Sequence, residues 1–186
     1  MISLYHIKID YPLTISNYIK WGLNSVPQIL NDIEIKRLID EIKILPPDFF
    51  RKVKPVIKSH NFKQHSEYNY DVLGENGTNY VLIYRQCLND VLDFSVGLGY
   101  RKPDLSRPFL LKRYNGFHEH TNTLENETFE KFHIHTATER YQQSGFKEEH
   151  FAEESSLYSN ARDALTCLLR DCHFQSTTLS LSRWGV

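Results

Sequence analysis

The chain has 186 residues, with 22 basic and 23 acidic side chains, so its formal net charge at pH 7 is −1 when the histidines are neutral. This length suits one substantial hydrophobic core and is short for two, so we expect a single domain over residues 1–186. The balance of charge excludes proteins that bind nucleic acid or membranes through their net charge alone. Only a local cluster of charge can carry such an argument here.

The cysteines and the N-terminal residues indicate the cellular compartment in which the protein is expected. Cys87, Cys167 and Cys172 form no Cys-x-x-Cys pair and cannot all pair within one chain, which favours a reducing compartment. The apolar residues of the N-terminus are interrupted by charged residues from Lys8 to Lys20, so neither a signal-peptide core nor a membrane-spanning helix is expected. We therefore predict a cytoplasmic protein that does not contact a membrane.

Residues 1–65 form the N-terminal part of the predicted domain, with helical and irregular structure. Alternating apolar residues over 2–9 are consistent with a strand. Asn31 and Glu34 have the spacing of a capping box, and the apolar residues after them recur at helical spacing until Pro46-Pro47. This pattern predicts a helix over residues 32–45.

Residues 66–186 form the predicted sheet with its C-terminal helix. Asn76-Gly77 is typical of a tight hairpin turn, and strands follow over residues 94–100, 109–114 and 131–137. Thr138 can cap a short helix, and an apolar stripe over residues 159–171 predicts a longer one. We therefore predict an α+β fold, a curved antiparallel sheet of about five or six strands with helices packed on one side.

Two His-x-His motifs stand close together, His118-Glu119-His120 and His133-Ile134-His135. Alternate side chains of an extended strand share a face, so each motif places two imidazoles side by side, and a short connection could bring all four together. Phe132 and Ile134 turn inward, so His133 and His135 point away from the apolar face. Because imidazole titrates near neutral pH and binds transition metals, the motifs indicate acid–base catalysis or a metal site.

The acid–base hypothesis needs no cofactor and has RNA as its substrate. One histidine takes the proton of a ribose 2′-hydroxyl, another group protonates the leaving oxygen, and a cation stabilises the charge on phosphorus. The predicted catalytic residues are His118, His120, His133 and His135, with Glu139 orienting a histidine. The predicted substrate-binding residues are Arg113 and Arg140, which bind phosphate, and the neighbouring Tyr114 and Tyr141.

Other hypotheses remain beside this one. His118, His120 and Glu125 have the spacing by which cupin barrels hold a divalent metal, although the following glycine and a further histidine of that pattern are missing. The four histidines could also hold a structural zinc ion. A non-catalytic module could bind protein or nucleic acid through the basic segment 49–66 and exposed tyrosines. In the plainest interpretation, the histidines are polar residues on the solvent face of a strand.

The run Leu111–Asn122, the run Phe132–Gln142, Ala152-Glu153 and Tyr158 resemble a family of small bacterial proteins of toxin–antitoxin or phage-defence loci. The similarity covers residues 80–174. The arginine–tyrosine strand end and the His-rich loop are also similar to TumE-like toxins. The resemblance implies a ribonuclease-type toxin or defence protein, with an antitoxin or defence protein as partner. It assigns no catalytic residue and leaves a homodimer open.

Overall fold

The computed structural model describes residues 29–52, 55–60, 63–103 and 105–176, so the strand predicted over residues 2–9 lies outside them. Their helices are α1 (Asp32–Asp40), α2 (Phe49–Lys52), α3 (Glu139–Gln143) and α4 (Ala161–Asp171). The strands are β1 (Lys43–Leu45), β2 (Val56–His60), β3 (Lys63–Gly74), β4 (Asn79–Cys87), β5 (Phe94–Tyr100), β6 (Phe109–Asn122), β7 (Glu127–Thr136), β8 (Ala152–Glu154) and β9 (Phe174–Ser176). None of these helices is long and apolar enough to cross a membrane.

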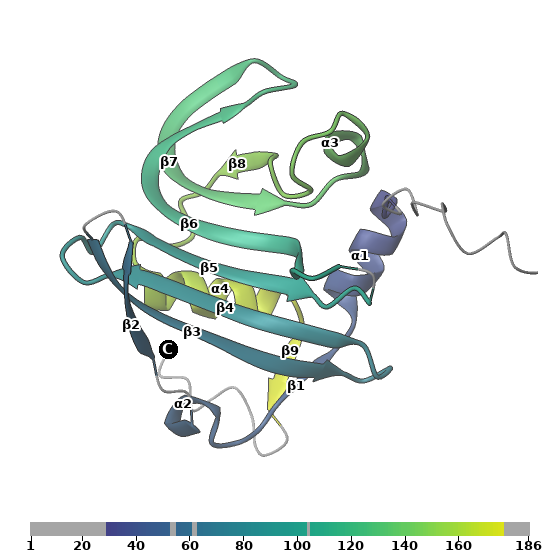
Figure 1. Cartoon of the computed structure of the whole chain (residues 1–186), viewed down its shortest axis with the longest axis vertical. Coiled ribbons are helices and arrows are strands. Elements are labelled where there is room, and N and C mark those ends of the chain that lie inside the picture. The colour runs from purple at the N-terminus through teal and green to yellow at the C-terminus, as the bar shows by residue number, and fades with distance from the viewer. Residues whose placement is uncertain (1–28, 53–54, 61–62, 104, 177–186) are drawn as a thin grey trace, which may run out of the picture.

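The strands form one strongly curved sheet in the order β8-β7-β6-β5-β4-β3-β1-β9, with β2 paired to β3 (Figure 1). The predicted α+β class and the curvature are confirmed, but the predicted number of about five or six strands was too small. The sheet is also mixed, because β1 and β9 pair in parallel. Strands β1, β8 and β9 have three residues each, which is too short for a pattern of alternation to be read from sequence.

The predicted helix over residues 32–45 is shorter than expected. Its capping box is present, since the Asn31 side chain accepts from the Glu34 N–H and the Glu34 carboxylate accepts from the Asn31 N–H. The helix ends at Asp40, because Glu41 turns toward Tyr80, whose hydroxyl donates to its carboxylate at 2.8 Å. Lys43 then begins β1 between β3 and β9. Long-range pairing therefore overrides the helical pattern of residues 42–45.

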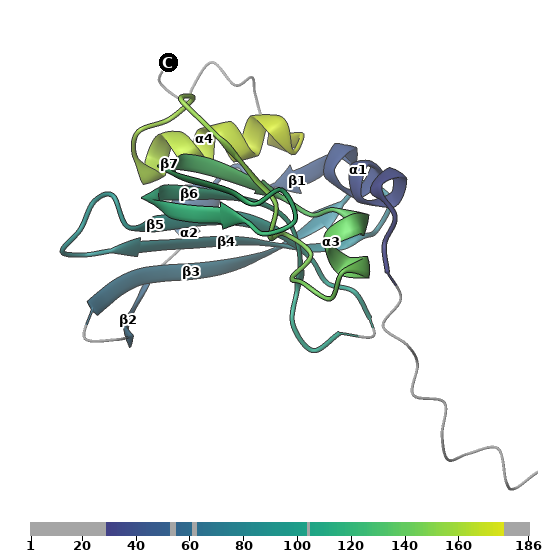
Figure 2. The ribbon, with the colours of Figure 1, turned by 90° about the horizontal axis from the view of Figure 1, so that it is seen from above.

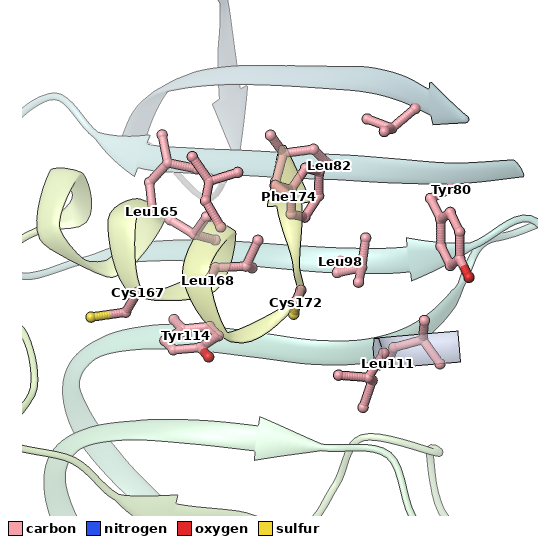
Figure 3. Close-up of a cluster of buried hydrophobic side chains, with 14 of the residues drawn as sticks. Tyr80, Leu82, Leu98, Leu111, Tyr114, Leu165, Cys167, Leu168, Cys172 and Phe174 are labelled. Atoms are coloured by element: carbon pink, nitrogen blue, oxygen red, sulfur yellow. The ribbon is translucent and has the colours of Figure 1, made fainter. Parts of the chain in front are cut away.

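Alternation along the strands separates an apolar face from a polar one. Helix α4 lies along the apolar face (Figure 2) and packs its buried leucines over the inner residues of β4, β5 and β6 (Figure 3). The side chain of Asn160 caps α4, as expected of a helix beginning near residue 159. Residues of this core include Tyr80, Leu82, Leu98, Leu111, Tyr114, Leu165 and Leu168.

The opposite face carries a row of polar cross-strand neighbours. The strand register places them side by side from β3 to β7, as Glu67, Arg85, Ser95, Asn115 and His133. No helix comparable to α4 covers this row in the described part of the chain (Figure 2). The two histidines of β7 therefore stand on the side of the sheet away from the apolar core, as their alternation with Phe132 and Ile134 predicted.

The hairpin formed by β6 and β7 curls back over α3 and β8 (Figure 1). Its far end is held down by the buried Asn122, whose side chain donates to the Ala152 carbonyl at 2.8 Å and accepts from the Ala152 N–H at 2.9 Å. Strand β6 thus runs eight residues beyond its predicted end at Tyr114, and the first His-x-His motif lies within the strand instead of in a loop.

Candidate metal centre on the polar face of the sheet

A one-residue bulge in β6 decides which histidines face the polar side. Asn115 pairs with His133, but His118 pairs with Lys131, so one extra residue lies between these two pairs. A shift of one residue moves the following side chains to the other face. After the bulge His118, His120 and Asn122 therefore share the face of His133 and His135, and Phe117 turns to the apolar side against Phe132.

The structure gathers all four imidazoles. The ring centre of His133 lies 4.6 Å from that of His118, 5.2 Å from that of His120 and 4.8 Å from that of His135. One ring nitrogen each of His120, His133 and His135 lies within 4.8 Å of the others, so these three form a group that could hold a metal ion. We call them the three-histidine centre. His118 lies beside it at the exposed edge, whereas His133 and His135 are buried.

Backbone carbonyls set the tautomer of each ring in this centre. His133 Nδ1 lies 2.8 Å from the Lys131 carbonyl oxygen, and His135 Nδ1 lies 2.8 Å from that of Glu149. His120 Nε2 lies 3.0 Å from the His150 carbonyl oxygen. A carbonyl only accepts, so each of these nitrogens carries the proton and the other nitrogen of each ring keeps its lone pair. Histidine ligands of metals are usually oriented in this way.

Burial keeps these imidazoles neutral. It lowers the pKa of His135 to about 2 and the pKa of His133 to about 4, and the guanidinium of Arg113 acts in the same direction on both. The pKa of His120 is lowered as well, chiefly by burial, and the pKa of His118 is lowered because its ring is partly desolvated, although the residue as a whole is exposed. At neutral pH these rings are therefore poor proton donors, and they have the unprotonated form that a metal ligand requires.

Polar groups without partners lie beside the three-histidine centre. Arg113 is the cross-strand neighbour of His135, and its Nη2 lies 3.8 Å from a carboxylate oxygen of Glu149. Arg113 Nε, Asn115 Oδ1 and Glu149 Oε2 are buried and have no hydrogen-bond partner among the described residues. Buried polar atoms are normally satisfied, so these three are candidates for contact with a ligand.

Two of the predicted substrate-binding groups lie away from the centre, in contacts of their own. Tyr114 belongs to the apolar core, and its hydroxyl donates to Asp171 at 2.7 Å. Tyr141 is buried and donates to Glu125 at 2.6 Å. Of the predicted substrate-binding residues, Arg113 is the one placed beside the imidazoles.

The predicted acidic and basic partners from the hairpin end and α3 are also engaged elsewhere. Glu125 forms an ion pair with Arg140 and is in no group of candidate metal ligands among the described residues, so the cupin-like set of His118, His120 and Glu125 is not assembled. The side chain of Glu139 accepts from Gln143 at 2.8 Å. The orienting role expected of Glu139 falls instead to the backbone carbonyls of Lys131, Glu149 and His150.

Sequence reasoning missed Asn115, Asn122 and Glu149. Asn115 donates from Nδ2 to His133 Nε2 at 3.4 Å and to His135 Nε2 at 3.1 Å. Asn115-Gly116 looks like the end of a strand, and Glu149 lies in an acidic stretch that looks solvated. A possible signal was the pair of asparagines, at 115 and 122, that brackets the first His-x-His motif.

Comparison with known proteins adds no assignment: no protein-family model, no curated protein and no solved structure matches this chain.

Proposed function

We propose that this protein is a metal-dependent hydrolase in which His120, His133 and His135 hold a divalent transition metal such as zinc. The observation that carries the proposal is the set of three hydrogen bonds from ring N–H groups to backbone carbonyls, which leaves one lone pair on each imidazole. Three histidines with an open fourth position are a known ligand set of catalytic zinc. The proposed metal set differs from the cupin-like set expected from sequence.

Such a metal supplies a nucleophile at neutral pH, because it lowers the pKa of a bound water to about 7. Arg113 stands next to His135 with an unpartnered Nε, so it stabilises negative charge on the substrate. His118 lies outside the ligand set and at the exposed edge. With a metal bound, His118 would be the base that takes a proton from the bound water and passes it to the leaving oxygen.

RNA, the substrate expected from sequence, remains our candidate substrate. Arg113 would bind a negatively charged oxygen of its phosphodiester. The neutral state of His133 and His135 disfavours the metal-free version of this chemistry, because neither ring is in the imidazolium form that a general acid needs at neutral pH. In this proposal the acid–base role therefore belongs to His118 and a metal-bound water, and His133 and His135 are ligands. The antitoxin or defence partner stays a prediction.

The test measures metal content and RNA cleavage on the same samples. We expect His135→Asn to lose the zinc ion of the three-histidine centre, and we expect His173→Asn, at an exposed histidine on another part of the fold, to keep it. Cleavage of a fluorogenic RNA should require the metal and should fall about 100-fold in Arg113→Gln, the effect typical of losing an oxyanion contact. Thermal unfolding monitors the fold of each variant.

Two outcomes contradict the proposal. If folded protein binds no zinc, or if His135→Asn binds zinc as the wild type does, the three-histidine centre is not a metal site. If zinc binds but RNA is not cleaved, the centre stands and the RNA hydrolase does not.

A further inference from the structure

A second group of metal-binding side chains lies on the same face of the sheet, at the paired ends of β3 and β4. His65 and Cys87 are cross-strand neighbours, and the Cys87 N–H donates to the Asp93 carbonyl at 2.8 Å. One ligand atom of each of His65, Cys87 and Asp93 lies within 4.8 Å of the other two. Three strand spacings separate Cys87 on β4 from the histidines on β7, about 14 Å, so the two groups cannot share one ion.

The three side chains offer an imidazole nitrogen, a sulfur and a carboxylate oxygen, a set that suits zinc and similar borderline metals. His65 and Cys87 are buried, with 1% and 2% exposure. The side chain of Asp93 is 27% exposed, so an ion reaches the group from the Asp93 side. Thiolate and carboxylate together carry two negative charges, which a divalent cation neutralises.

A cationic side chain already lies at this position. Arg85 Nη2 lies 2.6 Å from His65 Nε2 and 3.8 Å from an Asp93 carboxylate oxygen. A guanidinium only donates, so His65 Nε2 is the acceptor in this contact. His65 Nε2 and the second Asp93 oxygen are 3.7 Å apart, close to the separation of two ligands of one metal. Arg85 is partly exposed and also lies 3.8 Å from Glu67, toward which it can withdraw.

We infer that His65, Cys87 and Asp93 form a second site for a divalent transition metal such as zinc, which replaces the guanidinium of Arg85. Binding forms bonds from the metal to His65 Nε2, Cys87 Sγ and an Asp93 oxygen, and the thiol proton is released to solvent. Because Arg85 carries positive charge into the same space, it competes with the ion.

The second site also supports the bulge that orients the first. The Phe117 N–H donates to the Leu92 carbonyl at 3.1 Å. A Cβ atom at Gly116 would lie 1.7 Å from that carbonyl oxygen, so the loop before Asp93 packs directly on the bulge. A metal that holds Asp93 to His65 and Cys87 therefore fixes the backbone from which His118 and His120 extend.

Titration of the full chain with cobalt(II) tests the second site separately, because it contains sulfur and the three-histidine centre does not. We expect the ultraviolet thiolate-to-cobalt absorption in the wild type and in His135→Asn. Cys87→Ser should lose this absorption, while Cys167→Ser, at a buried thiol on α4, should keep it. Arg85→Met should bind cobalt at this site about tenfold more tightly, because a competing charge is removed.

The absence of the thiolate absorption from folded wild-type protein would overturn the inference, as would its survival in Cys87→Ser. If Cys87→Ser does not fold, Asp93→Asn provides the same test at a partly exposed position: weaker cobalt binding supports the site and unchanged binding overturns it. An Arg85→Met affinity equal to that of the wild type would show that the ion does not take the position of the guanidinium, and the proposed coordination would fall.

Discussion

Single hydrogen-bond partners decide what each imidazole can do. His133 and His135 carry their protons on Nδ1, because a backbone carbonyl oxygen faces that nitrogen in each ring. The Nε2 atoms of both rings accept hydrogen bonds from the side-chain amide of Asn115. This amide therefore lies at the position where a further metal ligand would be needed.

The distances allow Asn115 to change its role. Its Nδ2 lies 3.4 Å and 3.1 Å from the two histidine nitrogens, and ligands of tetrahedral zinc at about 2.1 Å from the ion are about 3.4 Å apart. Half a turn of the amide would bring Oδ1, which has no hydrogen-bond partner among the described residues, to this position. In that orientation Asn115 would be a fourth protein ligand, and the water of the proposed hydrolysis would be the fifth ligand. In the other orientation Asn115 is a hydrogen-bond donor to both rings.

Substitutions at Asn115 test this role. Asn115→Asp places an anionic oxygen at the same position, so we expect zinc to bind about tenfold more tightly or better. Asn115→Leu has similar volume and no oxygen, so we expect binding about tenfold weaker. Competition with a chromophoric zinc chelator measures both affinities. Three equal affinities would show that residue 115 does not contact the metal.

At the scale of elements, the curl of the β6–β7 hairpin closes the three-histidine centre. Asn122 holds the far end of the hairpin to β8, and its Oδ1 also lies 3.2 Å from His120 Nε2. The hairpin end makes a further contact with α3, where the Tyr141 hydroxyl accepts from the Leu124 N–H at 3.3 Å. The element that carries His120 is therefore positioned by segments that follow it in the chain.

Asn122→Ala should weaken folding and metal binding together. It leaves the buried N–H and carbonyl of Ala152 without their partner, which costs about 3 kcal/mol of the free energy of unfolding. Zinc affinity should fall because the His120 ring keeps only one of its two partners, the His150 carbonyl. Urea unfolding and zinc titration measure the two effects.

The neighbouring Thr121→Ala is the matched control. Thr121 is exposed and contacts the Thr128 hydroxyl across the hairpin, so its loss should cost less than about 1 kcal/mol. Equal effects of the two substitutions would show that Asn122 does not hold the hairpin.

At the scale of the whole molecule, Lys43 joins the N-terminal and C-terminal ends of the fold. It lies on β1 between β3 and β9, and its buried Nζ donates to the carbonyls of Leu38 and Ile39 at the end of α1. Burial lowers the pKa of Lys43 from 10.5 to about 8. Burying this charge therefore costs stability wherever the lysine is protonated.

The stability of the protein should therefore rise between about pH 7 and pH 9. The unfolded chain binds more protons than the folded one between pH 8 and 10.5, so deprotonation of Lys43 favours the folded state. We expect a gain of about 1 kcal/mol in the free energy of unfolding between pH 7 and pH 9. Denaturant unfolding at several pH values measures it, and Lys43→Met should remove the rise. If stability still rose with pH in Lys43→Met, groups other than Lys43 would be its cause.

Much of the local structure could be predicted from sequence, because its causes are local. The capping box of Asn31 and Glu34, the Asn-Gly hairpin turn and the apolar stripe of α4 each depend on residues a few positions apart. The short strands β1 and β9 could not be predicted, because their pairing partners lie far along the chain.

For the candidate site, the sequence by itself determined that His133 and His135 lie opposite Phe132 and Ile134, because side chains alternate along any strand. Only the tertiary structure decided that His120 joins them. The bulge after Asn115 shifts the alternation of β6 by one residue, and it forms where the loop around Leu92 packs against Gly116. A contact between segments distant in sequence leaves no periodic pattern in either segment, so the third ligand became visible only once the strands were paired.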